Sequence, residues 1–295
     1  MKTIRVGGLA LLLALAPSCK GQAPEPRLPR LPLPGPDDVP AVEAFEPFLA
    51  QKGRLIDALF AIDALVQPDL DQTAARERYE GLLRKARPLV EKARATGGSQ
   101  AAALEILGVL RADGFRYSAL QSESTRWSLQ YGSITEGLRD RLGICLSFTL
   151  LTMAMLDACG IESWSACYPR HILVRVDQDG REIELESTTF GDPVGVTVPP
   201  ELAARSIEAG FLYTRSLDRA QTAWVYLTER LWEWVLRRVK DAHSFALLER
   251  AEKQLPGTNE SMGMQWAIRH HLRSGSRGLT TAEREAAYKA ASEEL

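Results

Sequence analysis

The sequence predicts an α+β fold, in which a helix and antiparallel strands form a core flanked by N-terminal and C-terminal helices. Apolar residues recur at three- and four-residue spacing over much of the chain, which is typical of one helix face. Within residues 138–189 this spacing changes to the alternation that is typical of strands. The chain has 295 residues, 45% hydrophobic and 25% charged, which is the composition of a folded globular protein.

The charge balance argues against one class of partner. Lys and Arg number 36 against 38 Asp and Glu, so the formal net charge is −2. The basic residues do not gather into a stripe that would bind a polyanion. We therefore expect no nucleic-acid partner.

Residues 1–18 predict a secretory signal peptide. Lys2 and Arg5 precede an apolar run that is too short to cross a bilayer as an ordinary helix, and the small residue Ser18 stands just before Cys19. This ending resembles the processing site of bacterial lipoproteins, which implies a lipid on Cys19; a plain signal peptide cut nearby is the alternative. We expect export across the bacterial inner membrane, with the lipid anchoring the protein to the cell envelope, facing the periplasm or the cell surface.

Residues 19–40 predict an extended tether. Seven of the chain's 16 prolines fall within residues 23–40, and such a segment favours polyproline conformation over a helix. A proline-rich docking motif is the alternative reading.

Helical spacing resumes at Ala41 and continues to about Leu110. Pro68 interrupts the first stretch, and adjacent Gly97 and Gly98 end the next one. The two later helices are expected at Thr73–Ala95 and Ala101–Arg111. We expect this helical part and the strands to form one domain, residues 41–198.

Residues 199–295 predict a helical C-terminal region. The expected helices are Glu201–Arg215, Asp218–Lys240, His243–Gln254, Ser261–Arg273 and Thr281–Glu294. Residues 243–272 resemble about one tetratricopeptide-type unit, although helices simply packed on the core are an equal alternative. Core packing explains the tryptophans of this region, Trp224, Trp232 and Trp234. A groove for a protein partner on these helices is the alternative hypothesis.

The middle of the chain predicts one apolar helix followed by three strands. The helix covers Leu146–Ala158, and Gly160 stands where a left-handed C-terminal cap is expected. The expected strands are Ile161–Tyr168, Ile172–Val176 and Glu182–Glu186, with a four-residue turn at residues 177–180.

Three residues of this core predict nucleophilic catalysis. Cys145 stands at the start of the apolar helix, where the helix dipole and unpaired N–H groups favour a thiolate. His171 heads the second strand, and the four-residue turn places it directly opposite Glu186. A turn one residue shorter would place Ser187 there instead. A carboxylate at this position would fix the tautomer of the imidazole.

The run GICLSFTLLTMAMLDACGIESWSACYPRHILVRV, followed by IELESTT, resembles the transglutaminase-like core of the papain-like superfamily. QPDLD and Phe115-Arg116-Tyr117 are similar to the helical N-terminal part of the branch that joins this core to tetratricopeptide-like helices. The resemblance implies Cys145 as nucleophile, His171 as base and Glu186 as orienting acid. The chain departs from the family pattern at Glu186, where Asp is usual, and at Ser187, where Pro is usual.

The resemblance implies an amide or peptide bond hydrolase or acyl transferase that works through a thioester on Cys145, with a peptide or protein amide as substrate. Many members of this branch lack the cysteine and are thought not to be catalysts, whereas this chain has it. A non-catalytic binding module at the membrane surface is the alternative.

Several further residues have open roles. The backbone N–H of Cys145 is the first candidate for the oxyanion donor, with Ser133, Thr135, Trp164 and Tyr168 as second donors, substrate walls or simple packing residues. Cys159 and Cys167 could form a disulfide in an oxidising compartment or remain buried thiols. The chain has no metal-binding motif and no glycine-rich phosphate loop outside the signal, so we expect no metal and no cofactor.

Overall fold

The computed structural model describes residues 53–67, 69–117, 132–168, 171–191, 214–237 and 255, all within one compact unit, residues 32–295. The predicted signal peptide, Cys19, the tether and the helices expected beyond residue 240 lie outside these residues, as do Trp232 and Trp234 as side chains. The elements are α3 (Leu55–Val66), α4 (Thr73–Ala112), β1 (Arg116–Tyr117), α6 (Ile134–Asp140), β2 (Leu142–Gly143), α7 (Cys145–Ala158), β3 (Ser163–Tyr168), β4 (His171–Gln178), β5 (Arg181–Leu185), β6 (Ser216–Leu217) and α9 (Arg219–Arg237).

The four-stranded sheet confirms an α+β fold with antiparallel pairing. Its strand order is β5-β4-β3-β6, and every neighbouring pair is antiparallel. The two-residue strand β6 was not predicted, nor was the parallel pair of β1 and β2, which pairs Tyr117 with Gly143. Strands of two residues leave no alternation to detect in a sequence.

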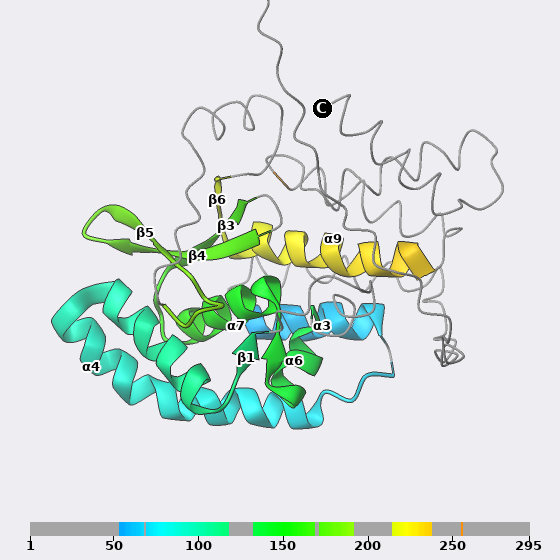
Figure 1. The fold of residues 1–295 in the computed structure, drawn as a ribbon, viewed down its shortest axis with the longest axis horizontal. Coiled ribbons are helices and arrows are strands. Elements are labelled where there is room, and N and C mark those ends of the chain that lie inside the picture. The colour runs from blue at the N-terminus through cyan, green and yellow to red at the C-terminus, as the bar shows by residue number, and fades with distance from the viewer. Residues whose placement is uncertain are drawn as a thin grey trace, which may run out of the picture. The chain divides into compact units, whose positions relative to one another are not determined.

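Helix α7 is the centre of the described fold. Residues 146–156 are all buried, as expected of a helix that is apolar on every side. It packs against β3 and β4 on one side and against α3 and α4 on others (Figure 1). The helix ends as predicted at Gly160, whose φ of 68° allows the N–H of Ile161 to reach the carbonyl of Leu156 at 3.0 Å.

Helix α9 shows how one C-terminal element relates to this core. It begins at Arg219, close to the predicted start, and packs against α3 and β3. Trp224 is buried in the same hydrophobic core as α7. Thr214 and Arg215, predicted to end a helix, are not helical, and Thr214 has a positive φ of 63°.

The glycine pair in α4 marks a kink where the β4–β5 hairpin docks. Gly98 has φ 73° and ψ −160°, which joins two helical segments where a break was predicted. A Cβ at this position would lie 2.4 Å from the side-chain oxygen of Gln178, the last residue of β4. That oxygen accepts a hydrogen bond from the N–H of Gln100 at 3.2 Å. The helical N-terminal part therefore supports the hairpin directly.

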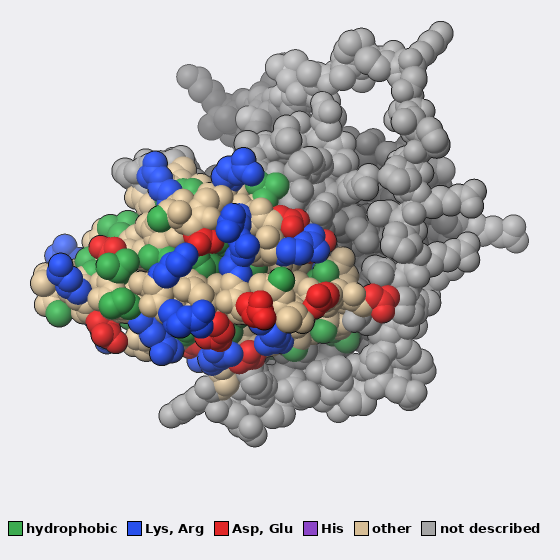
Figure 2. Space-filling view, turned by 90° about the horizontal axis from the view of Figure 1, so that it is seen from below, with side chains coloured by type: hydrophobic (Ala, Val, Ile, Leu, Met, Phe, Trp, Pro, Cys, Tyr) green, Lys and Arg blue, Asp and Glu red, His purple; other side chains and the backbone are tan. Residues whose placement is uncertain are grey.

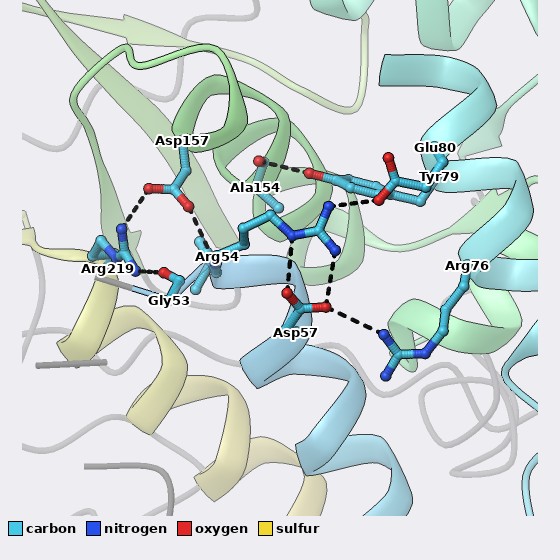
Figure 3. A network of polar contacts seen from close by, with 10 residues as sticks. Gly53, Arg54, Asp57, Arg76, Tyr79, Glu80, Ala154, Asp157 and Arg219 are labelled. Carbon is cyan, nitrogen blue, oxygen red and sulfur yellow. Dashed lines mark hydrogen bonds and ion pairs between the residues drawn. The ribbon is translucent and has the colours of Figure 1, made fainter. Parts of the chain in front are cut away.

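A network of ion pairs holds the C-terminal end of α7 (Figure 3). Asp157 accepts hydrogen bonds from the N–H of Leu55 at 2.9 Å and from Arg219 at 2.6 Å, and Arg219 also donates to the carbonyl of Gly53. Arg54 bridges Asp57 and Glu80. These bonds join the start of α3 to α4, α7 and α9.

The described surface seen from below carries basic and acidic side chains side by side (Figure 2). Asp113, for example, pairs with Lys85 at 2.8 Å, Arg141 at 3.3 Å and Arg78 at 3.8 Å. Such pairs are typical of a solvated surface. Within the described ranges, no helix is both long and apolar enough to cross a membrane.

Candidate active site

Cys145 is the first residue of α7 and is partly exposed. The preceding residue, Ile144, has extended backbone angles and donates its N–H to Oγ of Ser147 at 2.9 Å. The first helical bond then runs from the N–H of Phe148 to the carbonyl of Ile144 at 3.0 Å. The sulfur therefore lies in the first turn, whose N–H groups have no partner within the helix.

Gly143 allows the chain to approach α7 just before the cysteine. A Cβ on residue 143 would lie 2.5 Å from Oγ of Ser147 and 3.0 Å from the ring of Phe148. The first contact is too short for a Cβ and the second is tight, so a side chain here would force Ser147 to shift. The glycine in the Gly-x-Cys pattern is thus explained by packing.

His171 lies between the thiol and a carboxylate. It begins β4 directly opposite Tyr168 of β3, and its side chain is 18% exposed. Its imidazole interacts with the thiol of Cys145, and its Nε2 lies 2.7 Å from Oε2 of Glu186. The interactions with Cys145 and, second, with Glu186 raise the pKa of His171 to about 10. Because Glu186 occupies Nε2, Nδ1 is the nitrogen left for the thiol.

Glu186 is fixed by its own neighbours. It follows β5, its side chain is 5% exposed, and its Oε1 accepts the N–H of Thr188 at 2.9 Å and the hydroxyl of Thr188 at 2.5 Å. Burial alone would raise the pKa of Glu186, but the hydrogen bonds from His171 and Thr188 outweigh it and the net pKa is lowered. Glu186 is therefore a charged partner for the imidazole.

The strand register that led to Glu186 was wrong, although the contact is present. Gln178 pairs with Arg181, so the turn has two residues rather than four. Asp179 and Gly180 both have positive φ, 57° and 78°, which matches the hairpin turn whose twist suits paired strands. Continued past β5, this register puts Glu186 diagonally beside His171 instead of opposite it, a distance that long side chains can span.

Sequence reasoning missed Thr149, and it named Ser187 only as the residue that a shorter turn would place opposite His171. Thr149 lies one turn after Cys145, and its hydroxyl contacts the carbonyl of Ile172 and the hydroxyl of Ser187, both at 3.0 Å. Thr188 was missed as well. A threonine within an apolar helix reads as a core residue, and the only available signal was its spacing of four residues from Cys145.

Of the expected alternatives, Ser133 and Thr135 have the packing role, because both hydroxyls are buried and donate to Asp63 at 2.8 Å. Asp63 is fully buried and also accepts the hydroxyl of Tyr226 at 2.5 Å, with Arg230 3.3 Å away. These bonds make a structural link between α3, α6 and α9.

Two other candidates lie on β3. The hydroxyl of Tyr168 is held by Glu184 and by Arg175, the latter at 3.2 Å, so it is a part of the sheet's own polar network. Trp164 pairs with Arg175 across the sheet and is partly exposed.

Cys159 and Cys167 are free thiols in the structure. Of the two alternatives, a disulfide or unpaired thiols, the structure has the second. Cys167 lies on β3 opposite Ile172, and burial raises its pKa to about 12. Cys159 caps the C-terminal end of α7, and burial raises its pKa too.

No group of three or more His, Cys, Asp or Glu side chains within the described part of the chain could hold a metal ion. Comparison of the chain with protein-family models, with curated proteins and with solved structures finds no match. The argument for function therefore depends on the residues themselves.

Proposed function

We propose that this protein is an extracytoplasmic cysteine-dependent hydrolase or acyl transferase that cleaves amide or peptide bonds. One observation carries the proposal, namely that His171 lies between Cys145, with which it interacts, and Glu186, to which it hydrogen-bonds. The order of a helix-borne cysteine, a strand-borne histidine and a following carboxylate resembles the transglutaminase-like core. This arrangement supports a papain-like fold for residues 41–198.

The reaction uses each residue in a defined way. The reacting state is the ion pair in which the thiol proton of Cys145 has passed to His171, and the sulfur attacks the carbonyl carbon of the amide as a thiolate. The backbone N–H of Cys145 is the first candidate to bind the developing oxyanion. His171 then gives its proton to the leaving amine, which departs and leaves a thioester on Cys145. Water or an acceptor amine attacks the thioester, which yields hydrolysis or acyl transfer.

The electrostatics of His171 suit this sequence of steps. A pKa of about 10 means that the imidazole carries a proton at neutral pH. It is therefore ready to protonate the leaving amine, and the charged Glu186 stabilises the imidazolium ion. A carboxylate in this place also keeps the ring oriented while the proton moves.

The N-terminal sequence supports a location outside the cytoplasm. The signal peptide and the Ser18-Cys19 ending favour a lipid on Cys19, and the proline-rich tether would separate the folded part from the membrane. A peptide or protein amide in the cell envelope is then the proposed substrate.

Thiol labelling tests the catalytic pair. The full chain, purified in detergent, is treated with iodoacetamide at neutral pH, and modification of Cys145 and of Cys159 is followed by peptide mass spectrometry. We expect Cys145 to react faster than Cys159, and His171→Ala to slow Cys145 by about a hundredfold or more without changing Cys159. Equal rates, unaffected by His171→Ala, would instead favour the non-catalytic binding module.

Trapping of the thioester tests the chemistry. Peptide amides are incubated with the protein and hydroxylamine, which converts a thioester to a hydroxamic acid. We expect hydroxamate with the natural chain and none with Cys145→Ala, which has no nucleophile. Hydroxamate formed at the natural rate by Cys145→Ala would rule out a thioester on this cysteine.

A further inference from the structure

We propose that Thr149 is a positioning residue that holds Cys145, His171 and Glu186 in mutual register through one buried hydroxyl group. This inference rests on the function proposed above. It concerns how the three residues are held together, since they come from three separate elements.

Thr149 lies where it can reach both partners of the thiol. It follows Cys145 by four residues on α7, so the two share one side of the helix. Its hydroxyl lies 3.0 Å from the carbonyl of Ile172, which is adjacent to His171, and 3.0 Å from the hydroxyl of Ser187, which is adjacent to Glu186. The hydroxyl oxygen of Thr149 therefore contacts the backbone of the residue after His171 and the side chain of the residue after Glu186.

The direction of both hydrogen bonds follows from counting protons. The carbonyl of Ile172 can only accept, so Thr149 must donate its one hydroxyl proton to it. The bond between Thr149 and Ser187 must then be donated by Ser187. Thr149 and Ser187 are both 0% exposed, so water does not compete for these bonds. Loss of the hydroxyl would leave buried polar groups without partners, which is costly.

A second contact strengthens the hold on the turn after Glu186. The rings of Phe148 and Phe190 meet edge to face, with centroids 5.5 Å apart. The N–H of Gly191 also donates to the carbonyl of Glu186 at 2.9 Å. Adjacent residues of α7 thus anchor the turn that carries the carboxylate, while the first residue of the same helix carries the thiol.

Thr152 provides a matched control. It is also fully buried on α7, but its hydroxyl donates to the carbonyl of Phe148 within the same helix at 2.8 Å. Thr152→Val therefore makes the same chemical change at similar burial without breaking a bond to the strands. A difference between Thr149→Val and Thr152→Val isolates the link to His171 and Glu186.

The test measures the ratio of Cys145 to Cys159 alkylation by iodoacetamide in the folded full chain. We expect Thr149→Val to lower this ratio by between about tenfold and about a hundredfold, because small misplacements of reacting groups have large effects on rate. Thr149→Ser keeps the hydroxyl and should stay within about threefold of the natural chain. Thr152→Val should leave the ratio unchanged.

A second readout reports on the imidazole directly. The titration of His171 is followed by nuclear magnetic resonance of its ring nitrogens. We expect Thr149→Val to lower the pH at which the ring loses its proton, because its bonds to Cys145 and Glu186 loosen. Thr149→Ser and Thr152→Val should titrate as the natural chain does. A residue that only stabilises the fold would not move this value.

Identical ratios and titrations for Thr149→Val and Thr152→Val would overturn the positioning role. Should Thr149→Val fail to fold, Ser187→Ala replaces it, since it removes one of the two bonds, and a drop in the ratio of about threefold to tenfold is expected. No drop would overturn the proposal. His171→Ala separates the two levels of inference. If His171→Ala leaves the alkylation rate of Cys145 unchanged, the proposed function fails. If His171→Ala slows this alkylation but Thr149→Val does not, only the role of Thr149 fails.

Discussion

Two partly exposed thiols mark the two ends of α7, and their surroundings differ. Cys145 is the first residue of the helix and interacts with His171, which in turn hydrogen-bonds to Glu186. Cys159 is the C-terminal cap, where burial raises its pKa and the carbonyl end of the helix offers no stabilisation to an anion. The two thiols are thus similarly exposed but have different neighbours. Position on the helix and the nearest side chains, rather than exposure, make Cys145 the candidate nucleophile.

The two ends are also held differently. Ion pairs through Asp157 and Arg219 fasten the C-terminal end to the start of α3 (Figure 3), whereas neutral hydroxyl groups of Thr149 and Ser187 hold the N-terminal end. The contacts that fasten the C-terminal end thus include an ion pair, whereas those of Thr149 and Ser187 join neutral groups. The charged groups beside Cys145, namely His171 and Glu186, belong to the candidate site itself.

The largest expected effect comes from exchanging each sulfur for oxygen. We expect Cys145→Ser to reduce hydroxamate formation by about ten-thousandfold or more, since it removes the nucleophile, and Cys159→Ser to change it by less than about twofold. Rates are measured with the same peptide amide for both variants. A comparable loss in both variants would mean that the two ends are not functionally distinct.

The next effect is on the pH dependence of stability at the reactive end. The pKa of His171 is raised from 6.5 to about 10 by Cys145 and Glu186, so the folded state binds this proton more tightly than the unfolded state. The resulting stability is fully present below about pH 6.5 and is lost as the pH rises through about 10. A shift of this size corresponds to about 5 kcal/mol at most, and solvent screening at the partly exposed imidazole reduces this to about 2 to 4 kcal/mol.

Urea unfolding of the natural chain and of His171→Ala at pH 6, 8 and 10 measures this contribution. We expect the difference in unfolding free energy between the two to be largest at pH 6 and smallest at pH 10. Parallel curves would show that His171 does not gain a proton partner on folding.

At the opposite end we expect Asp157→Ala to lower the unfolding free energy by about 2 to 3 kcal/mol, because the N–H of Leu55 and the charge of Arg219 lose their partner. Asp157→Asn, which keeps an acceptor oxygen, should lose less. Alkylation of Cys145 in the folded protein should not change. Slower alkylation of Cys145 in Asp157→Ala would show that the two ends of α7 are not independent.

The smallest effect is expected from Gly160→Ala. Nothing lies within 4 Å of a Cβ there, so only the positive φ of 68° opposes the change, which corresponds to about 1 kcal/mol. Thermal unfolding should show a fall of a few degrees, with the Cys145 to Cys159 labelling ratio unchanged. A loss of stability as large as that of Asp157→Ala would contradict the open space around a Cβ at this position.

The elements that sequence reasoning predicted well are those with a long, regular pattern. α7 and its Gly160 cap could be placed within a residue, and so could the start of α4, because apolar spacing and glycine position define them. The hairpin turn could not, because three of residues 177–180, namely Asp177, Asp179 and Gly180, are common turn residues. The choice between a two-residue and a four-residue turn depends on strand twist, which favours positive φ at Asp179 and Gly180.

The candidate site was predictable in its three titratable residues but not in its supports. Cys145, His171 and Glu186 belong to residue types that carry nucleophilic chemistry. They also stand at the ends of a predicted helix and predicted strands, and these ends can be located from the sequence pattern. Thr149 and Ser187 act through tertiary contacts between residues far apart in the chain. No local pattern distinguishes such a threonine from one like Thr152, which bonds within its own helix.

The anchoring of Gly53 has a mechanical consequence. Arg219 donates to the carbonyl of Gly53 and Asp157 accepts the N–H of Leu55, so both hold the chain at the start of α3. If the N-terminal segment tethers the protein to a membrane, as proposed, any tension that reached Gly53 would be borne by α9 and the C-terminal end of α7. The load path would stop a full helix length away from Cys145, so a stretched tether would leave the geometry of the thiol and its histidine undisturbed.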